Sequence, residues 1–145
     1  MSTIDTVALP AEPVVLRAAD AMPASVFGPV TRSDIVRYAG ASGDLNPIHH
    51  DEPFAVGSGL PSVFGMGMLH AGILGNRLAR WVGPDNLRSF AVRFTGLVWP
   101  GDELILTGQV TAVEDGLATI EMLVTRDGQE PVLTATATAI VASTA

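Results

Sequence analysis

One short polar segment, GDLNPIHHDEP at residues 43–53, stands out in a chain that is otherwise rich in Ala, Val, Leu and Gly. It carries a carboxylate at Asp44, a carboxamide at Asn46 and an imidazole at His49, and it holds two of the three histidines in the chain. Pro47 stops a helix and is disfavoured in a central strand, so we expect these side chains on a kinked loop or at a helix edge. Carboxylates and imidazoles act as general acids and bases, so the segment predicts acid–base chemistry on a loop.

Taken one at a time, these side chains have ordinary structural interpretations. An aspartate at position 44 is typical of a helix end, an Asn-Pro pair is typical of a turn, and a lone histidine is typical of a partly buried, hydrogen-bonded residue. The ordered set before a glycine-opened apolar helix is what favours a functional site. By contrast, we interpret His50 as a residue beside a helix cap and His70 as a packed or interface residue.

Two short helices are predicted on either side of the polar segment. Thr31 or Ser33 can cap the first, which Gly40 and Gly43 are expected to end. The second covers residues 51–56 in one or two turns, with Asp51 as its cap. The polar segment is therefore expected to bridge two helix ends.

A long helix and a run of strands complete the predicted fold. Residues 67–82 place apolar side chains at helical spacing, and a Gly-Pro pair ends the helix. One strand is predicted at residues 14–17, and four more follow the helix in SFAVRFTGLVW, ELILTGQVTAV, LATIEMLVT and PVLTATATAIV. A helix that is apolar around much of its girth must be covered, and an antiparallel sheet curled around it does this. We therefore predict an α+β fold in one domain, residues 13–145, after a flexible arm at residues 1–12.

The composition excludes several kinds of chemistry. Without cysteine there is no disulfide, no thiolate nucleophile and no cysteine-based metal site, and we predict no metal. The chain has no lysine, so a Schiff base on a lysine side chain is excluded. A formal net charge of −7 without a basic cluster argues against nucleic acid and against anionic membrane surfaces as partners.

Further expectations concern what the chain binds and where it works. Single arginines can still hold phosphates bidentately, and the candidates are Arg77, Arg80, Arg88 and Arg93. The hydrophobic content of 48% and the exposed strand edges of a curled sheet predict that two such units pair. The N-terminal segment has an acid and two prolines where a signal peptide needs positive charge and an apolar core, which predicts a cytoplasmic protein.

The motif D-x-N-P-I-H at residues 44–49, followed by Gly67-Met68 at the start of the long helix, resembles the MaoC-like hot dog dehydratases. This family includes the R-specific enoyl-CoA hydratases. The likeness runs from about residue 31 to residue 141 and includes YAGASGD before the motif and PGDE at residues 100–103. It implies a hot dog fold, in which an antiparallel sheet wraps a long helix, in dimers or pseudo-dimers with active sites at the interface.

The resemblance also implies a role for each residue of the motif. It makes Asp44 and His49 the catalytic pair, Asn46 the neighbour that orients them, and the backbone N–H of Gly67 the donor to the thioester carbonyl. Family members commonly have a histidine where this chain has Met66, which leaves the acyl group open.

The implied activity is the reversible addition of water to a trans-2-enoyl-CoA, giving the (R)-3-hydroxyacyl-CoA. Coenzyme A enters as part of the substrate and no other cofactor is expected, with Arg88 and Arg93 as candidates for its phosphates. The expected partners are a CoA or acyl carrier protein thioester and a related hot dog chain in a homodimer, a heterodimer or a higher oligomer. Two alternatives stay open: a hot dog acyl-CoA thioesterase, and one subunit of a heteromeric dehydratase.

Hydration of an enoyl thioester needs three things from the protein. It needs a water held against the β carbon, a proton for the α carbon, and stabilisation of negative charge on the thioester oxygen. Asp44 and His49 can hold the water from two sides, and either one can deliver the proton. The N–H of Gly67, at a helix start, can face the developing charge.

Overall fold

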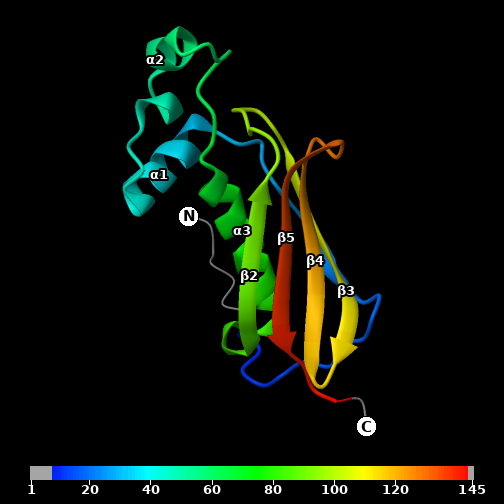
Figure 1. Cartoon of the computed structure of the whole chain (residues 1–145). Coiled ribbons are helices and arrows are strands. Elements are labelled where there is room, and N and C mark those ends of the chain that lie inside the picture. The colour runs from blue at the N-terminus through cyan, green and yellow to red at the C-terminus, as the bar shows by residue number, and fades with distance from the viewer. Residues whose placement is uncertain (1–7, 144–145) are drawn as a thin grey trace.

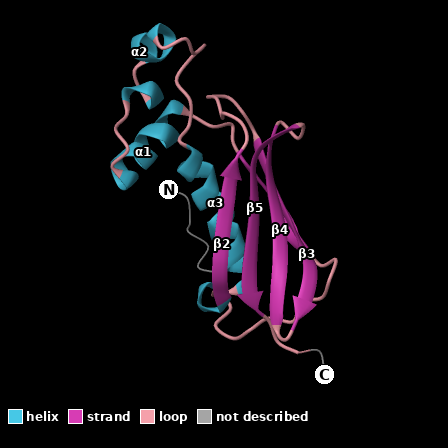
Figure 2. Cartoon of the chain, in the orientation of Figure 1, coloured by secondary structure: helices cyan, strands magenta, loops and turns pink. Residues whose placement is uncertain are grey.

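A five-stranded sheet and one long helix form the frame of the molecule. The computed structural model describes residues 8–143, and Figures 1 and 2 show a twisted sheet with helix α3 (Gly67–Val82) lying against one face. The sheet order is β1-β3-β4-β5-β2, and all neighbouring strands are antiparallel. The strands are β1 (Ala21–Phe27), β2 (Leu87–Phe94), β3 (Leu104–Glu114), β4 (Leu117–Arg126) and β5 (Glu130–Ile140). The predicted α+β arrangement is confirmed.

The core lies between α3 and one face of the sheet. Even-numbered residues from 118 to 124 are buried on β4, and on β5 the odd-numbered residues 133–139 pair with them across the ladder. Side chains alternate between the two faces of a strand, so this pattern gives one apolar face and one polar face. Alanines 135, 137 and 139 supply the β5 side, and Leu74 and Leu78 of α3 lie in the same core.

Two glycines of α3 tie the helix to the edge strand β2. A Cβ atom on Gly67 would lie 2.8 Å from the ring of Phe94, and one on Gly75 would lie 3.3 Å from the ring of Phe90. The rings therefore occupy the space that side chains would fill on this side of the helix. The close contact explains why small residues recur along α3.

Three short helices lie beyond the N-terminal end of α3 (Figure 1). They are α1 (Arg32–Ser42), the 3₁₀ helix η1 (Pro47–His49) and α2 (Glu52–Gly57). Thr31 caps α1 in a capping box with Asp34, and Gly43 ends it with a φ of 76°. Asp51 caps α2 through the N–H of Phe54. The predicted helices are confirmed, including the bounds of the long one.

The prediction of a strand at residues 14–17 is wrong. Within that range the structure has only an isolated bridge, from Val15 to Ala142, and the first strand is β1. β1 contains Pro23, which marked this region as loop. It is an edge strand whose pairing with β3 shifts register between Met22 and Ser25, and edges and bulges are the positions in a sheet that accept proline.

The predicted arm at residues 1–12 lies partly outside the described residues, which begin at residue 8. Its described end packs at the turn after α3. The Asn86 side chain, at the end of the 3₁₀ helix η2 (Pro84–Asn86), donates to the carbonyl of Glu12 (3.3 Å) and to that of Val82 (2.7 Å). A search of residues 8–143 finds no helix with the length and apolarity to cross a membrane.

The turn at Gly83 generates a stability prediction. Gly83 has a φ of 87°, and a Cβ there would lie 2.1 Å from the carbonyl oxygen of Pro10. We expect Gly83→Ala to lower the free energy of unfolding by at least about 2 kcal/mol, measured by urea unfolding followed by circular dichroism. Gly40→Ala is the matched control, because Gly40 lies inside α1 with nothing near its Cβ position, and it should raise stability by roughly 0.5–1 kcal/mol. Equal effects of the two substitutions would contradict this account of the turn.

Candidate active site

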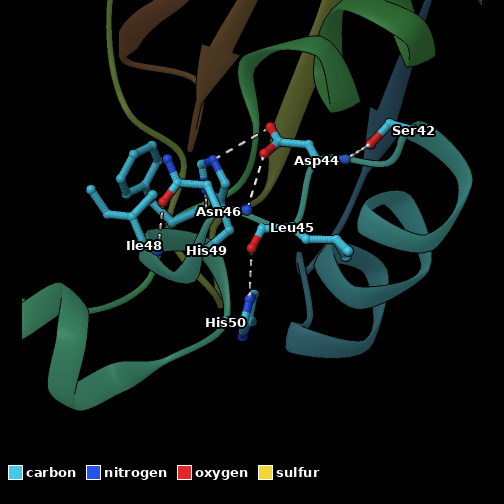
Figure 3. Close-up of polar contacts among 8 residues, drawn as sticks. Ser42, Asp44, Leu45, Asn46, Ile48, His49 and His50 are labelled. Carbon is cyan, nitrogen blue, oxygen red and sulfur yellow. Dashed lines mark hydrogen bonds and ion pairs between the residues drawn. The ribbon is translucent and has the colours of Figure 1, made fainter.

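The loop between α1 and η1 brings Asp44 and His49 together. Asp44 follows the left-handed Gly43 that ends α1, and His49 closes the single turn of η1. His49 Nε2 lies 3.7 Å from Asp44 Oδ2, and the two side chains point toward one another in Figure 3. The backbone N–H of Asp44 donates to the Ser42 hydroxyl at 3.2 Å. Two helix ends therefore position the pair.

The histidine is oriented by a backbone carbonyl. His49 Nδ1 lies 2.7 Å from the carbonyl oxygen of Phe64, and the ring packs edge-on against that residue's ring, with centroids 4.8 Å apart. A carbonyl oxygen only accepts, so this contact assigns the proton of the neutral imidazole to Nδ1. His49 is 9% exposed, and Nε2 is left as an acceptor facing Asp44.

The pair therefore presents two acceptors side by side. The Asp44 carboxylate accepts hydrogen bonds, and so does Nε2 of His49 in this tautomer. Their separation of 3.7 Å is too long for a direct hydrogen bond. A water molecule has two O–H donors, so it can satisfy both acceptors at once. The arrangement suits a general base that acts on a bound water.

Asn46 supports the loop rather than the pocket. Its side-chain oxygen accepts from the N–H of Ile48 at 3.1 Å and so caps η1, while its own N–H donates to Asp44 Oδ1 at 3.3 Å (Figure 3). It is not among the residues that line the pocket around Asp44 and His49. The contacts of Asn46 are thus made to the turn and through its main chain, and its orienting role stays a prediction.

A pocket of about 250 Å³ opens beside the pair. It is formed by the loop, by the start of α3 and by the end of β2, and its lining residues are Asp44, His49, Phe64, Gly65, Met66, Gly67, Met68, His70, Phe94, Gly96 and Leu97. The pair is thus neither sealed in the core nor turned away from the cavity. Sequence reasoning did not find Phe64 or Phe94, because a backbone carbonyl and an apolar ring carry no motif.

The start of α3 faces the same pocket. Gly67 is the first residue of the helix, and Met66 before it makes no side-chain capping hydrogen bond. The first N–H groups of a helix have no partner within the helix, and the helix dipole places positive charge there. Gly67 thus offers an amide donor on a wall that also contains Asp44 and His49.

Two further lining residues set the character of the pocket. Met66 is 2% exposed and fills the position where the family resemblance led us to expect a histidine. His70, one turn into α3, is also 2% exposed, and its Nε2 has no hydrogen-bond partner. Burial lowers the pKa of His70 to about 4, so the ring is neutral near pH 7. Its ring stands edge-on to Phe94 with centroids 6.0 Å apart.

The structure does not bring Arg88 and Arg93 to this pocket. The guanidinium of Arg88 donates to the carbonyls of Asp85 and Leu87, beyond the other end of α3. Arg93 precedes Phe94 on β2, so it lies on the opposite face of the sheet from that ring. The prediction that these two arginines bind CoA phosphates gains no support within a single chain.

Cavity size alone does not identify the site. A hollow of about 670 Å³ lies between β1, β3, β4 and β5, but Glu121 is its only ionisable lining residue. No group of three or more His, Asp or Glu side chains in the described part of the chain is arranged to hold a metal ion. The pocket at Asp44 and His49 is the place where acid–base groups and a helix start converge.

Comparisons with known proteins identify relatives of this chain. The family described as MaoC like domain matches residues 17–130. Over 91 residues the chain is 34% identical to the 3-oxo-4,17-pregnadiene-20-carboxyl-CoA hydratase beta subunit of Mycobacterium tuberculosis, a match covering 61% of this chain and 70% of that protein.

Solved structures are similar over almost the whole domain. The ChsH1-ChsH2 complex from Mycobacterium tuberculosis contains a chain that matches with a TM-score of 0.77 at 25% identity, covering 86% of this chain and 98% of that one. An (R)-hydratase from A. caviae involved in PHA biosynthesis matches with a TM-score of 0.78 at 22% identity, covering 88% of this chain and 98% of that one. The hot dog fold is confirmed.

The buried His70 predicts a pH dependence of stability. Its pKa is lowered to about 4 in the folded chain, from a usual value of 6.5, so between these values the unfolded chain binds more protons. The stability this residue contributes is present above pH 6.5 and is lost as pH falls to 4, an effect of about 3 kcal/mol. His70→Leu should remove this pH-dependent contribution. In urea unfolding, the free energy of unfolding of the variant should therefore fall less than that of the wild type as the pH is lowered. The exposed His50→Leu is the control, and an identical pH dependence in wild type and His70→Leu would contradict the assignment.

Proposed function

This chain belongs to the MaoC-like dehydratase family, and we propose that it adds water reversibly to a trans-2-enoyl-CoA, giving the (R)-3-hydroxyacyl-CoA. The activity is that of a hydro-lyase. The observation that carries the proposal is the pair of acceptors, Asp44 Oδ2 and His49 Nε2, set 3.7 Å apart on a pocket that also contains the start of α3.

The reaction uses the pair as follows. A water donates one hydrogen bond to Asp44 and one to His49, which fixes its oxygen lone pair toward C3 of the enoyl group. One of the two residues removes a proton as the oxygen bonds to C3, and the electron pair of the C2–C3 double bond moves toward the thioester oxygen. A proton is then delivered to C2, so the hydroxyl and the hydrogen of one water end on neighbouring carbons. Either residue is placed to make the delivery.

Gly67 supports the charged intermediate. The thioester oxygen gains negative charge as water adds, and an amide N–H at a helix start is a preorganised donor for it. Such a donor is typically worth about 10²- to 10³-fold in rate. The absence of a side chain on Gly67 lets the ring of Phe94 lie against the helix there, so an acyl group entering the pocket meets an apolar wall.

An assembly of two hot dog chains is part of the proposal. β2 is an edge strand, and Phe90 and Phe94 on it are 39% and 48% exposed. A related chain on this edge covers those rings and closes the open side of the pocket, and the resemblance to a subunit and to a chain of a complex supports such a partner. The partner is either a second copy or a related chain. Because Asp44 and His49 both come from this chain, we propose that it is the catalytic half of an assembly with a related chain, and that each copy carries its own pair in a homodimer.

Enoyl-CoA hydration tests the function directly. We expect loss of the enoyl absorbance with a panel of short, long and polycyclic trans-2-enoyl-CoA thioesters, and R stereochemistry in the product. Asp44→Asn and His49→Ala should each lower kcat by at least about 10²-fold, because they remove a group that acts in the transition state. His50→Ala is the matched control and should leave kcat unchanged, because the His50 ring is hydrogen-bonded to the Leu45 carbonyl and does not line the pocket.

Two outcomes would count against this function. If folded protein hydrates none of the thioesters, the proposal fails. If it releases free thiol instead, the chain is a thioesterase that uses the same bound water on the thioester carbon. A variant at Asp44 or His49 with an unchanged rate would remove that residue from the mechanism.

Whether the purified chain is active without a different partner chain is a separate question. If the chain pairs with itself, size exclusion with light scattering should give twice the mass of the chain, and the same fraction should be active. If the natural partner is a related chain, the purified protein should be inactive or weakly active alone and should gain activity when that chain is added. A fully active monomer would contradict the proposed assembly.

A further inference from the structure

A second pocket lies on the other side of α3, against β1. It has a volume of about 330 Å³ and is lined by Met22, Pro23, Ala24, Ser25, Arg77, Arg80 and Trp81. Its two ionisable side chains are arginines, and no acidic residue lines it. In a chain with a net charge of −7 and only eight basic residues, two unopposed guanidinium groups in one hollow are unusual.

Two polar atoms at this pocket are buried without a partner. Arg77 Nε and Ser25 Oγ are both shielded from solvent and make no hydrogen bond. Among the described residues neither Arg77 nor Arg80 forms an ion pair, and the Nε of Arg80 donates only to the side-chain oxygen of Asn76, at 3.1 Å. A buried donor left unpaired costs more free energy than one that meets an acceptor. Both residues line the pocket, although these two atoms are themselves covered by their neighbours.

This pocket is separate from the one that contains Asp44 and His49. Arg77 lies ten residues after Gly67 on α3, which corresponds to about 15 Å along the helix axis. The two pockets also use opposite edges of the sheet, because β1 lines one and β2 lines the other. A ligand in the second pocket is not in contact with the acid–base pair.

We propose that this second pocket binds a phosphate group, held by the guanidinium groups of Arg77 and Arg80 and by the hydroxyl of Ser25. Guanidinium groups match phosphate oxygens in a bidentate geometry, and two of them balance a dianion. The terminal nitrogens of the two guanidinium groups donate to the phosphate oxygens, and a small shift of the Arg77 and Ser25 side chains on binding gives their buried, unpaired donors a phosphate oxygen as acceptor. Trp81 forms an apolar wall beside the anion. This inference is independent of the proposed hydration.

The phosphate has two chemical sources that fit equally. It is either free inorganic phosphate or a phosphate monoester on a larger molecule, such as the 3′-phosphate of coenzyme A. Both present the same oxygens to the two arginines. The experiment separates them by comparing inorganic phosphate, coenzyme A and dephospho-coenzyme A.

The test compares urea unfolding midpoints in chloride and in phosphate at equal ionic strength, with isothermal titration of inorganic phosphate alongside. The wild-type midpoint should rise in phosphate by more than that of Arg77→Met does, because the general stabilising effect of phosphate acts on both proteins and binding at the site acts only on the wild type. Arg77→Met keeps the apolar stem and removes the guanidinium, so it should bind phosphate at least about tenfold more weakly. In chloride it should unfold no earlier than the wild type, since it no longer buries an unpaired donor. A purely structural role for Arg77 would lower the midpoint in both salts.

Two controls keep the result decisive. Arg93→Met removes one positive charge from the opposite side of the sheet and should respond to phosphate as the wild type does. Ser25→Ala removes only the hydroxyl and should weaken binding even if Arg77→Met fails to fold. Stabilisation by coenzyme A but not by dephospho-coenzyme A, lost in Arg77→Met, would assign the 3′-phosphate, and stabilisation by phosphate alone would assign the free ion. The proposal is overturned if none of the three ligands binds, or if Arg77→Met and Ser25→Ala respond as fully as the wild type.

Discussion

The proposed chemistry of this protein depends on two hydrogen-bond acceptors, on Asp44 and His49, that the backbone holds face to face. The carbonyl of Phe64 accepts from His49 Nδ1, so the ring turns its unprotonated nitrogen toward Asp44. The carboxylate of Asp44 accepts a hydrogen bond from the N–H of Asn46, and the backbone N–H of Asp44 donates to the Ser42 hydroxyl. Neither acceptor can satisfy the other, so a donor with two hydrogens is the natural occupant of the space between them. The proposed binding of water therefore rests on the number of donors and acceptors at the pair, and not on any feature of the substrate.

The rest of the fold keeps this pair next to an amide donor. The sheet buries one face of α3, and the polar loop lies beyond the helix start, where backbone N–H groups are unpaired. Glycine at position 67 allows the ring of Phe94 to close against the helix, which gives the pocket an apolar wall. Acid–base groups, a positive helix end and an apolar surface meet in one cavity because three separate elements end there.

Sequence reasoning succeeded where a local physical rule decides the outcome. The bounds of α3 follow from its apolar spacing and from Gly83, and Asp51 and Gly43 mark helix ends through capping and a left-handed φ. Asp44 and His49, which the family resemblance paired, lie five positions apart on one loop, so their proximity is local as well. Prediction from the sequence failed where the outcome depends on distant parts of the chain. β1 accepts Pro23 only because it lies at a bulged sheet edge, and the role of the Phe64 carbonyl is visible only once residues 49 and 64 are in contact.

The position of Phe94 links assembly to substrate choice. Its ring rests on the helix at Gly67, yet it belongs to an edge strand and remains 48% exposed. In the proposed assembly, the chain that adds to this edge contacts the same ring that lines the pocket from inside. If the proposed thioester binds there, the neighbouring chain completes the wall against its acyl group, so exchanging the neighbour would change which thioester is accepted while Asp44 and His49 stay the same.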